Sequence, residues 1–309
     1  MNYAFTNGKI LDGSRDMQVQ TGRCILVKNG KIHDIVPDTA DLSGYTKIDL
    51  KGHYILPGLI NMHVHLAGSG KPQKKQRDNE KLVNTIMSTS LTRAIAYRMV
   101  AGFAKDELLS GVTTIRTVGG PGDFDTRLRD EIKAGTKIGP RILASNQGIS
   151  VPGELKMPPE MVRAVCEKAH ADGYLVAAHV ESPEGVRVAL ENGVDSIEHG
   201  AKLTDEMVKL FKERGAFLCT TISPALPYAL FDRSITNATK RSAELTDIDS
   251  ITGSIEKGKA ADLIVTAQNP LKDLKALRNL EMVISGGRFI EHAKIKKRKQ
   301  VEAELDKFL

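Results

Sequence analysis

The 309-residue sequence lacks any run of about 18 apolar residues, the length that a membrane-spanning helix needs. Its first residues also lack a basic segment followed by a long apolar one, the pattern of a secretory leader. Cysteine is scarce: Cys24, Cys166 and Cys219 are far apart and flanked by apolar residues, which is typical of buried thiols in a reducing compartment. These absences predict a cytoplasmic protein with no membrane partner and no cysteine nucleophile.

The composition shows no bias toward disorder, since 41% of the residues are hydrophobic and 27% are charged, as in ordinary globular proteins. The net charge of +6 comes largely from two stretches, residues 71–77 and 294–299. Neither stretch contains interleaved aromatic residues, so we interpret both as solvated charge and expect no nucleic-acid partner. A chain of this length can bury one large core and a small satellite domain.

Both ends of the sequence have the character of β-strands. Short runs rich in β-branched residues occur at 3–6, 23–28, 31–36 and 47–50. The pair Asn29-Gly30 predicts a tight hairpin, because both positions of such a turn need positive φ. Similar alternation returns at 262–266, 281–285 and 288–290. We therefore predict one small composite β-sandwich domain from residues 1–57 and 252–290, followed by a charged helical tail at 291–309.

Between the two ends, buried apolar runs alternate with amphipathic helices, the pattern of a parallel sheet covered by helices. Strands are predicted at 59–66, 112–118, 141–145, 174–179, 194–198 and 216–222. Helices are predicted at 80–109, 161–169, 183–192 and 205–214, with Ser182 and Thr204 as N-caps and Gly215 past the last helix. Residues 58–251 are thus an α/β unit, either a β/α barrel or a doubly wound sheet.

Four of the eight histidines, His63, His65, His179 and His199, end predicted parallel strands. This edge of an α/β sheet or barrel is where functional sites lie. Residues two apart in a strand point the same way, so His63 and His65 can direct both imidazoles at one ion. A single histidine at such a position is more often a hydrogen-bonded core or rim residue, but four at equivalent positions favour a metal site.

Several motifs resemble those of the amidohydrolase superfamily. The run YILPGLINMHVHL at 54–66 is similar to its signature, and GVTTIRTVGG at 111–120 is similar to its second-strand motif. The run GSIEKGKAADLIV at 253–265 resembles the segment that re-enters the small β-domain. With Ala178-His179 and Glu198-His199-Gly200, the resemblance covers nearly the whole chain. It is closest to the imidazolonepropionase-like and Xaa-Pro dipeptidase (prolidase-like) branch.

This resemblance implies a TIM-type (β/α)8 barrel with a composite β-sandwich domain and one or two divalent ions, usually zinc. His63 and His65 would bind the more buried ion, and His179 and His199 would bind the second ion or orient the substrate carbonyl. Neutral imidazoles leave zinc strongly Lewis acidic, so the pKa of bound water falls toward about 7. The implied reaction is hydrolysis of a C–N bond in a dipeptide, an N-acyl amino acid or a cyclic amide.

Two parts of the family's machinery have no counterpart, because only six barrel strands can be counted. The lysine of the fourth strand would fall where only residues 151–157 are available, and no strand ending in aspartate follows Ile222. Three explanations are open. Either residues are left out of this sequence, or the chain is a deletion variant, or it is a divergent member of the family that coordinates metal differently. Lys156, Asp123, Asp125 and Asp232 could substitute for the missing lysine and aspartate, but none of them ends a predicted strand and we do not favour them.

Other functions stay open beside the leading one. A deaminase of the same superfamily is the second enzymatic reading, with Glu181 and Glu198 as its nearest acids. A metal-binding or assembly protein without a catalytic aspartate is the third. Arg116 and Tyr228 could grip a substrate carboxylate, although a structural ion pair and a core aromatic residue are the favoured alternatives. The expected partner is a small-molecule or dipeptide substrate, and assembly into a homo-oligomer is left open.

Overall fold

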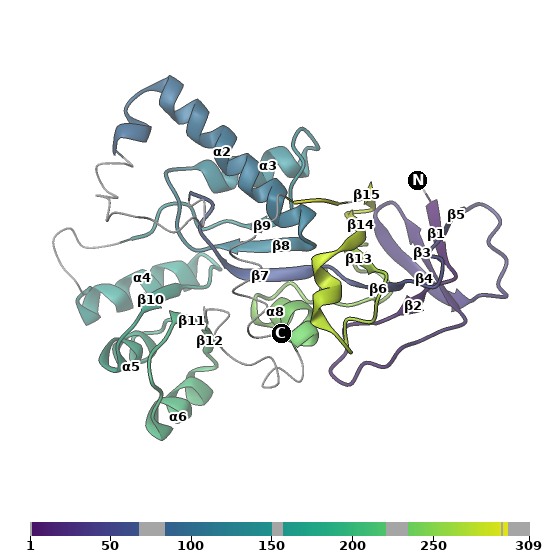
Figure 1. Ribbon diagram of the computed structural model, residues 1–309. Helices are drawn as coiled ribbons and strands as arrows, with labels where there is room; N and C mark the ends of the chain where they lie inside the picture. Colours follow the sequence, from purple (N-terminus) through teal and green to yellow (C-terminus); the bar gives the residue numbers. More distant parts are fainter. Residues whose placement is uncertain (1, 68–83, 150–156, 221–233, 292, 296–309) are drawn as a thin grey trace. The chain divides into compact units, whose positions relative to one another are not determined.

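The computed structural model describes residues 2–67, 84–149, 157–220, 234–291 and 293–295. The chain divides into two compact units, three sheets lying in the larger and one in the smaller, each unit with its own apolar residues (Figure 1). The larger unit takes residues 1–146 and 227–309, and the smaller unit takes residues 147–226. Among the described residues, no helix is both long and apolar enough to cross a membrane.

A four-stranded sheet in the larger unit contains the first strands of the chain, in the order β4-β3-β1-β5. Its strands are β1 (Asn2–Thr6), β3 (Arg23–Lys28), β4 (Lys31–Pro37) and β5 (Thr46–Asp49). β1 pairs antiparallel with β3 and parallel with β5. At the turn between β3 and β4, Asn29 and Gly30 have φ values of 52° and 76°, which confirms the hairpin predicted from this pair.

A second sheet of the larger unit joins strands from both ends of the chain, in the order β15-β14-β13-β6-β2. Its strands are β2 (Lys9–Ile10), β6 (Tyr54–Pro57), β13 (Leu263–Thr266), β14 (Leu280–Ser285) and β15 (Arg288–Glu291). Buried side chains of both sheets, among them Phe5, Ile25, Ile55 and Leu263, form one apolar cluster. The two ends of the chain therefore share a core, while the sandwich form and the boundaries of the composite domain stay predictions.

The third sheet of the larger unit is parallel and carries the first predicted site residues. Its strands are β7 (Leu59–Val64), β8 (Val112–Thr117) and β9 (Arg141–Leu143). Helices α2 (Ser90–Leu109) and α3 (Phe124–Lys133) lie beside it (Figure 1). Val64 and Ile115 of the sheet pack with Val100 of α2 and Leu128 of α3 in one buried cluster.

The smaller unit alternates helices with three parallel strands in the order β10-β11-β12. Its elements are α4 (Pro159–Ala171), β10 (Ala177–Val180), α5 (Pro183–Glu191), β11 (Ser196–His199), α6 (Asp205–Arg214) and β12 (Phe217–Cys219). The predicted caps are confirmed, because Ser182 accepts the Gly185 amide, Thr204 accepts the Met207 amide, and Gly215 has a φ of 66°.

All six predicted parallel strands are present, although they are shorter than predicted. The first was expected to run to residue 66 and ends at Val64, and the described part of the last ends at Cys219. Within residues 84–109, the long helix begins at Ser90. Closure of the two parallel sheets into one barrel stays a prediction, and the predicted tail helix lies largely outside the described residues.

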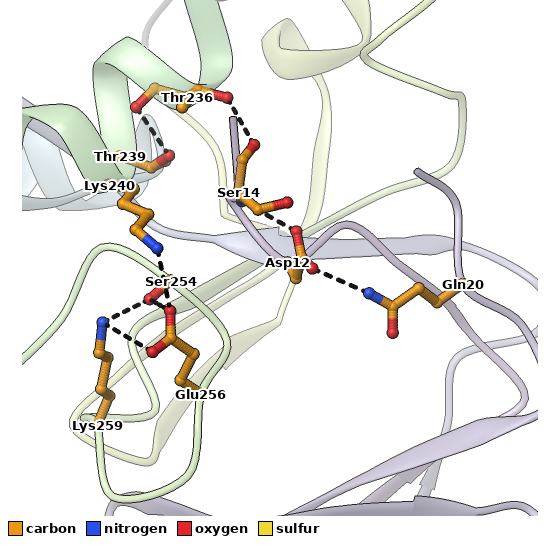
Figure 2. A network of polar contacts seen from close by, with 9 residues as sticks. All are labelled: Asp12, Ser14, Gln20, Thr236, Thr239, Lys240, Ser254, Glu256 and Lys259. Carbon is orange, nitrogen blue, oxygen red and sulfur yellow. Dashed lines mark hydrogen bonds and ion pairs between the residues drawn. The ribbon is translucent and has the colours of Figure 1, made fainter. Parts of the chain in front are cut away.

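Short helical turns bring the chain back into the larger unit. They are α7 (Ser234–Thr236), η2 (Asn237–Arg241), α8 (Ser242–Leu245) and, further on, η3 (Leu274–Arg278). A polar network fastens this return (Figure 2): Thr236 donates to the Ser14 carbonyl at 3.0 Å, and the buried Lys259 ammonium donates to Ser254 at 2.6 Å. Glu256 accepts from Ser254 and pairs with Lys240. The network connects the helical turns with the start of the chain.

Asp262 is a buried acid that joins four segments of the larger unit. Its carboxylate accepts hydrogen bonds from Arg141 of β9 at 3.0 Å, from the Thr252 hydroxyl at 3.2 Å and from the Gly286 amide at 2.7 Å. Its carbonyl accepts the amide of Gly58, directly before β7, at 2.8 Å. Because the Asp262 side chain is only 1% exposed, these donors take the place of water around the charge.

We expect Asp262→Asn to lower the free energy of unfolding by roughly 2–3 kcal/mol, because the amide nitrogen of Asn opposes the donors and leaves Arg141 without its counter-charge. Urea denaturation followed by circular dichroism measures this loss. Asp130→Asn is the control, since Asp130 forms an exposed pair with Arg129 on α3 and should change stability little. Equal, small effects of both substitutions would contradict the role given to Asp262.

Candidate metal centre

β7 carries a bulge directly before its end. Asn61 is paired with Ile115 of β8, but Val64 is paired with Thr117, so β7 has one more residue than β8 between these pairs. A bulge of this kind reverses the alternation of side chains along the strand and is common beside active sites.

The bulge decides which side chains of β7 face helix α2. Asn61 donates to Glu107 of α2 at 3.5 Å, and Val64 packs in the cluster that contains residues of the same helix. His63 and His65 flank Val64 along the chain and therefore point to the other side. Their ring centroids lie 5.0 Å apart, so the structure places this predicted pair together.

The ring of His65 is oriented by the main chain. Its Nδ1 donates to the carbonyl of Gly119 at 3.0 Å, which leaves the lone pair on Nε2. A hydrogen bond of this kind to a carbonyl is the usual second contact of a metal-binding histidine. Glycine is favoured at position 119, because its φ of 129° is a backbone conformation that residues with a Cβ rarely adopt.

Asn146 and Asp125 support the loop that carries Gly119. The Gly120 amide donates to the Asn146 carbonyl at 2.7 Å, and the Asn146 side chain accepts from the amide and hydroxyl of Thr126. Asp125 is buried, and burial raises the pKa of its carboxyl group, against the opposing effects of hydrogen bonds and of His65. Asp125 lies buried on α3 beside this loop, and the expectation that it is not a substitute ligand stays a prediction.

The other substitutes are no stronger candidates. Asp123 is exposed and lies 3.7 Å from Arg93. Lys156 and Asp232 lie outside the described residues.

His179 and His199 form the second pair, in the smaller unit. His199 is paired in register with Val180, so regular strand geometry would turn it away from His179. Its φ is 68°, and the Gly200 amide donates to the Glu198 carbonyl at 2.9 Å, which makes a three-residue turn around His199. Such turns are rare and strained. The turn brings His199 Nε2 to 2.8 Å from His179 Nδ1.

Both pairs fit a divalent ion by their donor chemistry. Imidazole nitrogens bind zinc at about 2.0–2.1 Å, so two nitrogens on one tetrahedral ion lie about 3.3 Å apart. The distance of 2.8 Å between His179 and His199 is a few tenths of an ångström shorter, which small ring rotations can change. The convergence of the two pairs on one centre stays a prediction.

Arg116 of β8 donates from Nε to the carbonyl of Met62 at 2.8 Å. Met62 lies within the bulge of β7, so this bond fixes the backbone next to His63. The predicted contact of Arg116 with a substrate carboxylate stays a prediction. Tyr228, the second predicted substrate residue, lies outside the described residues.

The smaller unit holds two further possible donors: Glu198, predicted from the sequence only as an acid of the deaminase alternative, and Cys219, predicted only as a buried thiol. Both are paired in register with the row that begins at His179. Each follows directly on an apolar residue that packs on the helices, Ile197 or Leu218, as His179 follows Ala178. That shared position in the alternation is the signal that could have identified them.

Residues 54–156 match the model of the amidohydrolase family. The structure resembles that of a protein from Bifidobacterium longum described provisionally as a prolidase, with a TM-score of 0.79 and 26% identity over 99% of this chain and 98% of that one. An Xaa-Pro dipeptidase with bound methionine has a TM-score of 0.76 at 24% identity, over 94% of this chain and 100% of that one, a likeness of fold alone.

Imidazolonepropionase of Klebsiella pneumoniae (strain 342) is 32% identical over 169 residues, which are 49% of this chain and 39% of that protein. The chain spans about half the length of the curated relatives it matches. Residues 54–156 are therefore an amidohydrolase family domain, and the structural matches imply a TIM-barrel-like α/β fold. The resemblance to the imidazolonepropionase-like and prolidase-like branch is confirmed.

Substituting each histidine of the second pair by glycine tests the strain at His199. His199→Gly removes the cost of a positive φ, so we expect stability to stay within about 0.5 kcal/mol of the wild type or to rise. His179→Gly deletes the same ring from regular strand backbone and should lower stability by about 1 kcal/mol. Urea denaturation in the presence of a chelator measures both. A loss for His199→Gly as large as that for His179→Gly would contradict a strained backbone.

Proposed function

We propose that this chain, whose residues 54–156 form an amidohydrolase family domain, is a metal-dependent hydrolase that cleaves a C–N bond in a small substrate. The observation that carries the proposal is the position of two pairs of imidazoles at the carboxyl ends of parallel strands. One pair is His63 with His65, and the other is His179 with His199. Active sites of α/β barrels lie at this end of the strands.

Histidine nitrogens of this kind suit zinc. Zinc held by neutral imidazoles supplies Lewis acidity, which polarises an amide carbonyl and makes water a stronger acid. The protein's part is to hold the rings: Gly119 fixes the tautomer of His65, and the turn at His199 directs its ring toward His179. We assign one or two ions, and zinc as the metal, as part of the proposal.

Xaa-Pro dipeptides are the first substrates to test, because two similar structures carry the names prolidase and Xaa-Pro dipeptidase. Other dipeptides, N-acyl amino acids and cyclic amides belong to the same proposed class, since each contains a C–N bond next to a carbonyl. Arg116 and Tyr228 are the residues we propose for contact with a substrate carboxylate. A cytoplasmic location remains part of the proposal.

One feature of the sequence favours a second candidate, a metal-binding protein without turnover. The positions where the family resemblance calls for a fourth-strand lysine and an eighth-strand aspartate fall close to residues 150–156 and 221–233, outside the described part of the chain. The sequence offers no strand that ends in aspartate there. A deaminase of the superfamily differs again, because it would release ammonia.

We expect the zinc-loaded chain to hydrolyse at least one substrate of this panel and to lose this activity with a chelator. His65→Gln should lower kcat/KM at least about 100-fold, because it removes one of the proposed donors. Release of a free amino acid, with ammonia measured in parallel, gives the readout. Elemental analysis of each variant gives its metal content.

His33→Gln is the matched control, since His33 is an exposed histidine of β4 and should leave metal content and turnover unchanged. Bound metal without turnover on any substrate would favour the metal-binding candidate, and ammonia release without amide cleavage would favour a deaminase. The absence of both metal and turnover would refute the proposed function for this chain.

A further inference from the structure

Helix α2 of the larger unit carries an apolar stripe on its exposed side. Leu91, Ile95 and Met99 follow one another at intervals of four residues, and their exposed fractions are 68%, 54% and 55%. Residues four apart lie on one face of a helix, so these side chains form a stripe and are not scattered singly over the surface. An exposed apolar stripe of this kind is typical of a surface that binds another protein.

The core of the larger unit uses a different face of α2. Tyr97, Val100 and Ala104 are buried in the cluster that also contains Ile115 of β8 and Leu128 of α3 (Figure 1). Because α2 is apolar on both faces, the packing of the core does not explain the stripe. Within the part of the chain that the structure describes, the stripe faces solvent.

Gly102 continues the exposed face of α2, three residues after Met99. Glycine is unfavourable in the interior of a helix, because it loses more conformational freedom than other residues when the helix forms. A Cβ added at this position would meet no atom within 4 Å, apart from its chain neighbours and the nearby backbone of the helix. The larger unit thus gives no reason for glycine here, whereas the close approach of a second backbone is such a reason.

Two opposite charges flank Gly102 at equal distances along the helix. Arg98 lies four residues before it and Asp106 four residues after it, and both side chains are exposed. Residues equally far on either side of one position in a helix are related by a two-fold axis through that position. In an antiparallel pair of helices that cross at Gly102, each Arg98 therefore meets Asp106 of the other copy. Ile95 likewise meets the half-buried Leu109 of the other copy.

We propose that α2 forms the interface of a homodimer, in which the α2 helices of two copies of this chain cross antiparallel at Gly102. Both copies contribute the same surface, as in most two-fold dimers. The two ion pairs between Arg98 and Asp106 select the antiparallel orientation, since a parallel pair in register would bring like charges together.

The expected dimer is a weak one. A single pair of helices belongs to the class of small interfaces that bury less than about 1,200 Å². The dimer is therefore in equilibrium with the monomer and its fraction rises with protein concentration. This inference does not depend on the proposed function, because none of the residues involved belongs to the candidate metal centre.

Charge reversal in the full-length chain tests the orientation of the two helices. Arg98→Asp leaves acidic residues at both positions and Asp106→Arg leaves basic residues at both, so like charges meet in each single-variant dimer. Each variant should associate at least about tenfold more weakly than the wild type, as sedimentation over a concentration series measures. An equimolar mixture of the two variants regains both ion pairs and should associate about as tightly as the wild type. Lys212→Asp, on an exposed lysine of α6, is the control and should leave association unchanged.

Gly102→Gln separates an effect on the interface from an effect on the fold. Glutamine favours the helix and has room for its Cβ, so the Tm of the monomer should stay the same or rise. Its side chain would keep the two backbones apart at the crossing, so association should weaken at least about tenfold.

A wild-type chain that stays monomeric over the whole concentration series would overturn the proposal. So would charge-reversed variants that associate as tightly as the wild type, or a mixture of them that stays monomeric. A Gly102→Gln dimer as tight as that of the wild type would overturn the crossing at Gly102. None of these results depends on bound metal or on turnover.

Discussion

The buried charge of Asp262 is the constraint on which the architecture of the larger unit depends. Its carboxylate binds β9 through Arg141 and the hairpin after β14 through the Gly286 amide, while its carbonyl holds Gly58 at the entrance to β7. A buried carboxylate is tolerated only when donors surround it, so these segments cannot separate without exposing an unpaired charge. Asp262, about two hundred positions further along the chain than Gly58, therefore fixes the point at which β7, the strand of His63, begins.

In regular β-strands the side chains of His63, His65 and His199 would not point in the directions that the structure shows. An extra residue in β7 turns His63 and His65 away from α2, and a positive φ turns His199 toward His179. The positive φ of His199 costs conformational free energy, and both devices lie at the carboxyl ends of parallel strands, where bulges and strained residues are typical of functional sites. The Met62 carbonyl within the bulge is held by Arg116, so a residue predicted to bind substrate has at least a supporting part in this geometry.

The sequence predicted much of this structure because its signals are local. The Asn29-Gly30 turn, the caps at Ser182 and Thr204, and the six parallel strands each follow from a few neighbouring residues. The bulge in β7 and the row from His179 to Cys219 depend on pairing between strands far apart in sequence, which no local pattern specifies. For the same reason Cys219 was interpreted as one more buried thiol, although it is half-buried beside Glu198.

The hydrogen bond between His179 and His199 bears on how readily this pair could accept an ion. One ring nitrogen donates and the other accepts, so the two rings share a single proton along the line between them. An ion held by both nitrogens would require this proton to move to the solvent or to the other nitrogen of its ring, and the two nitrogens would have to separate by only about half an ångström to reach tetrahedral spacing. The turn at His199 has already fixed the backbone, so little further ordering is required. Under the proposed function, the strain at this residue would be the cost of a pair arranged before the ion arrives, which is how preorganised sites gain affinity.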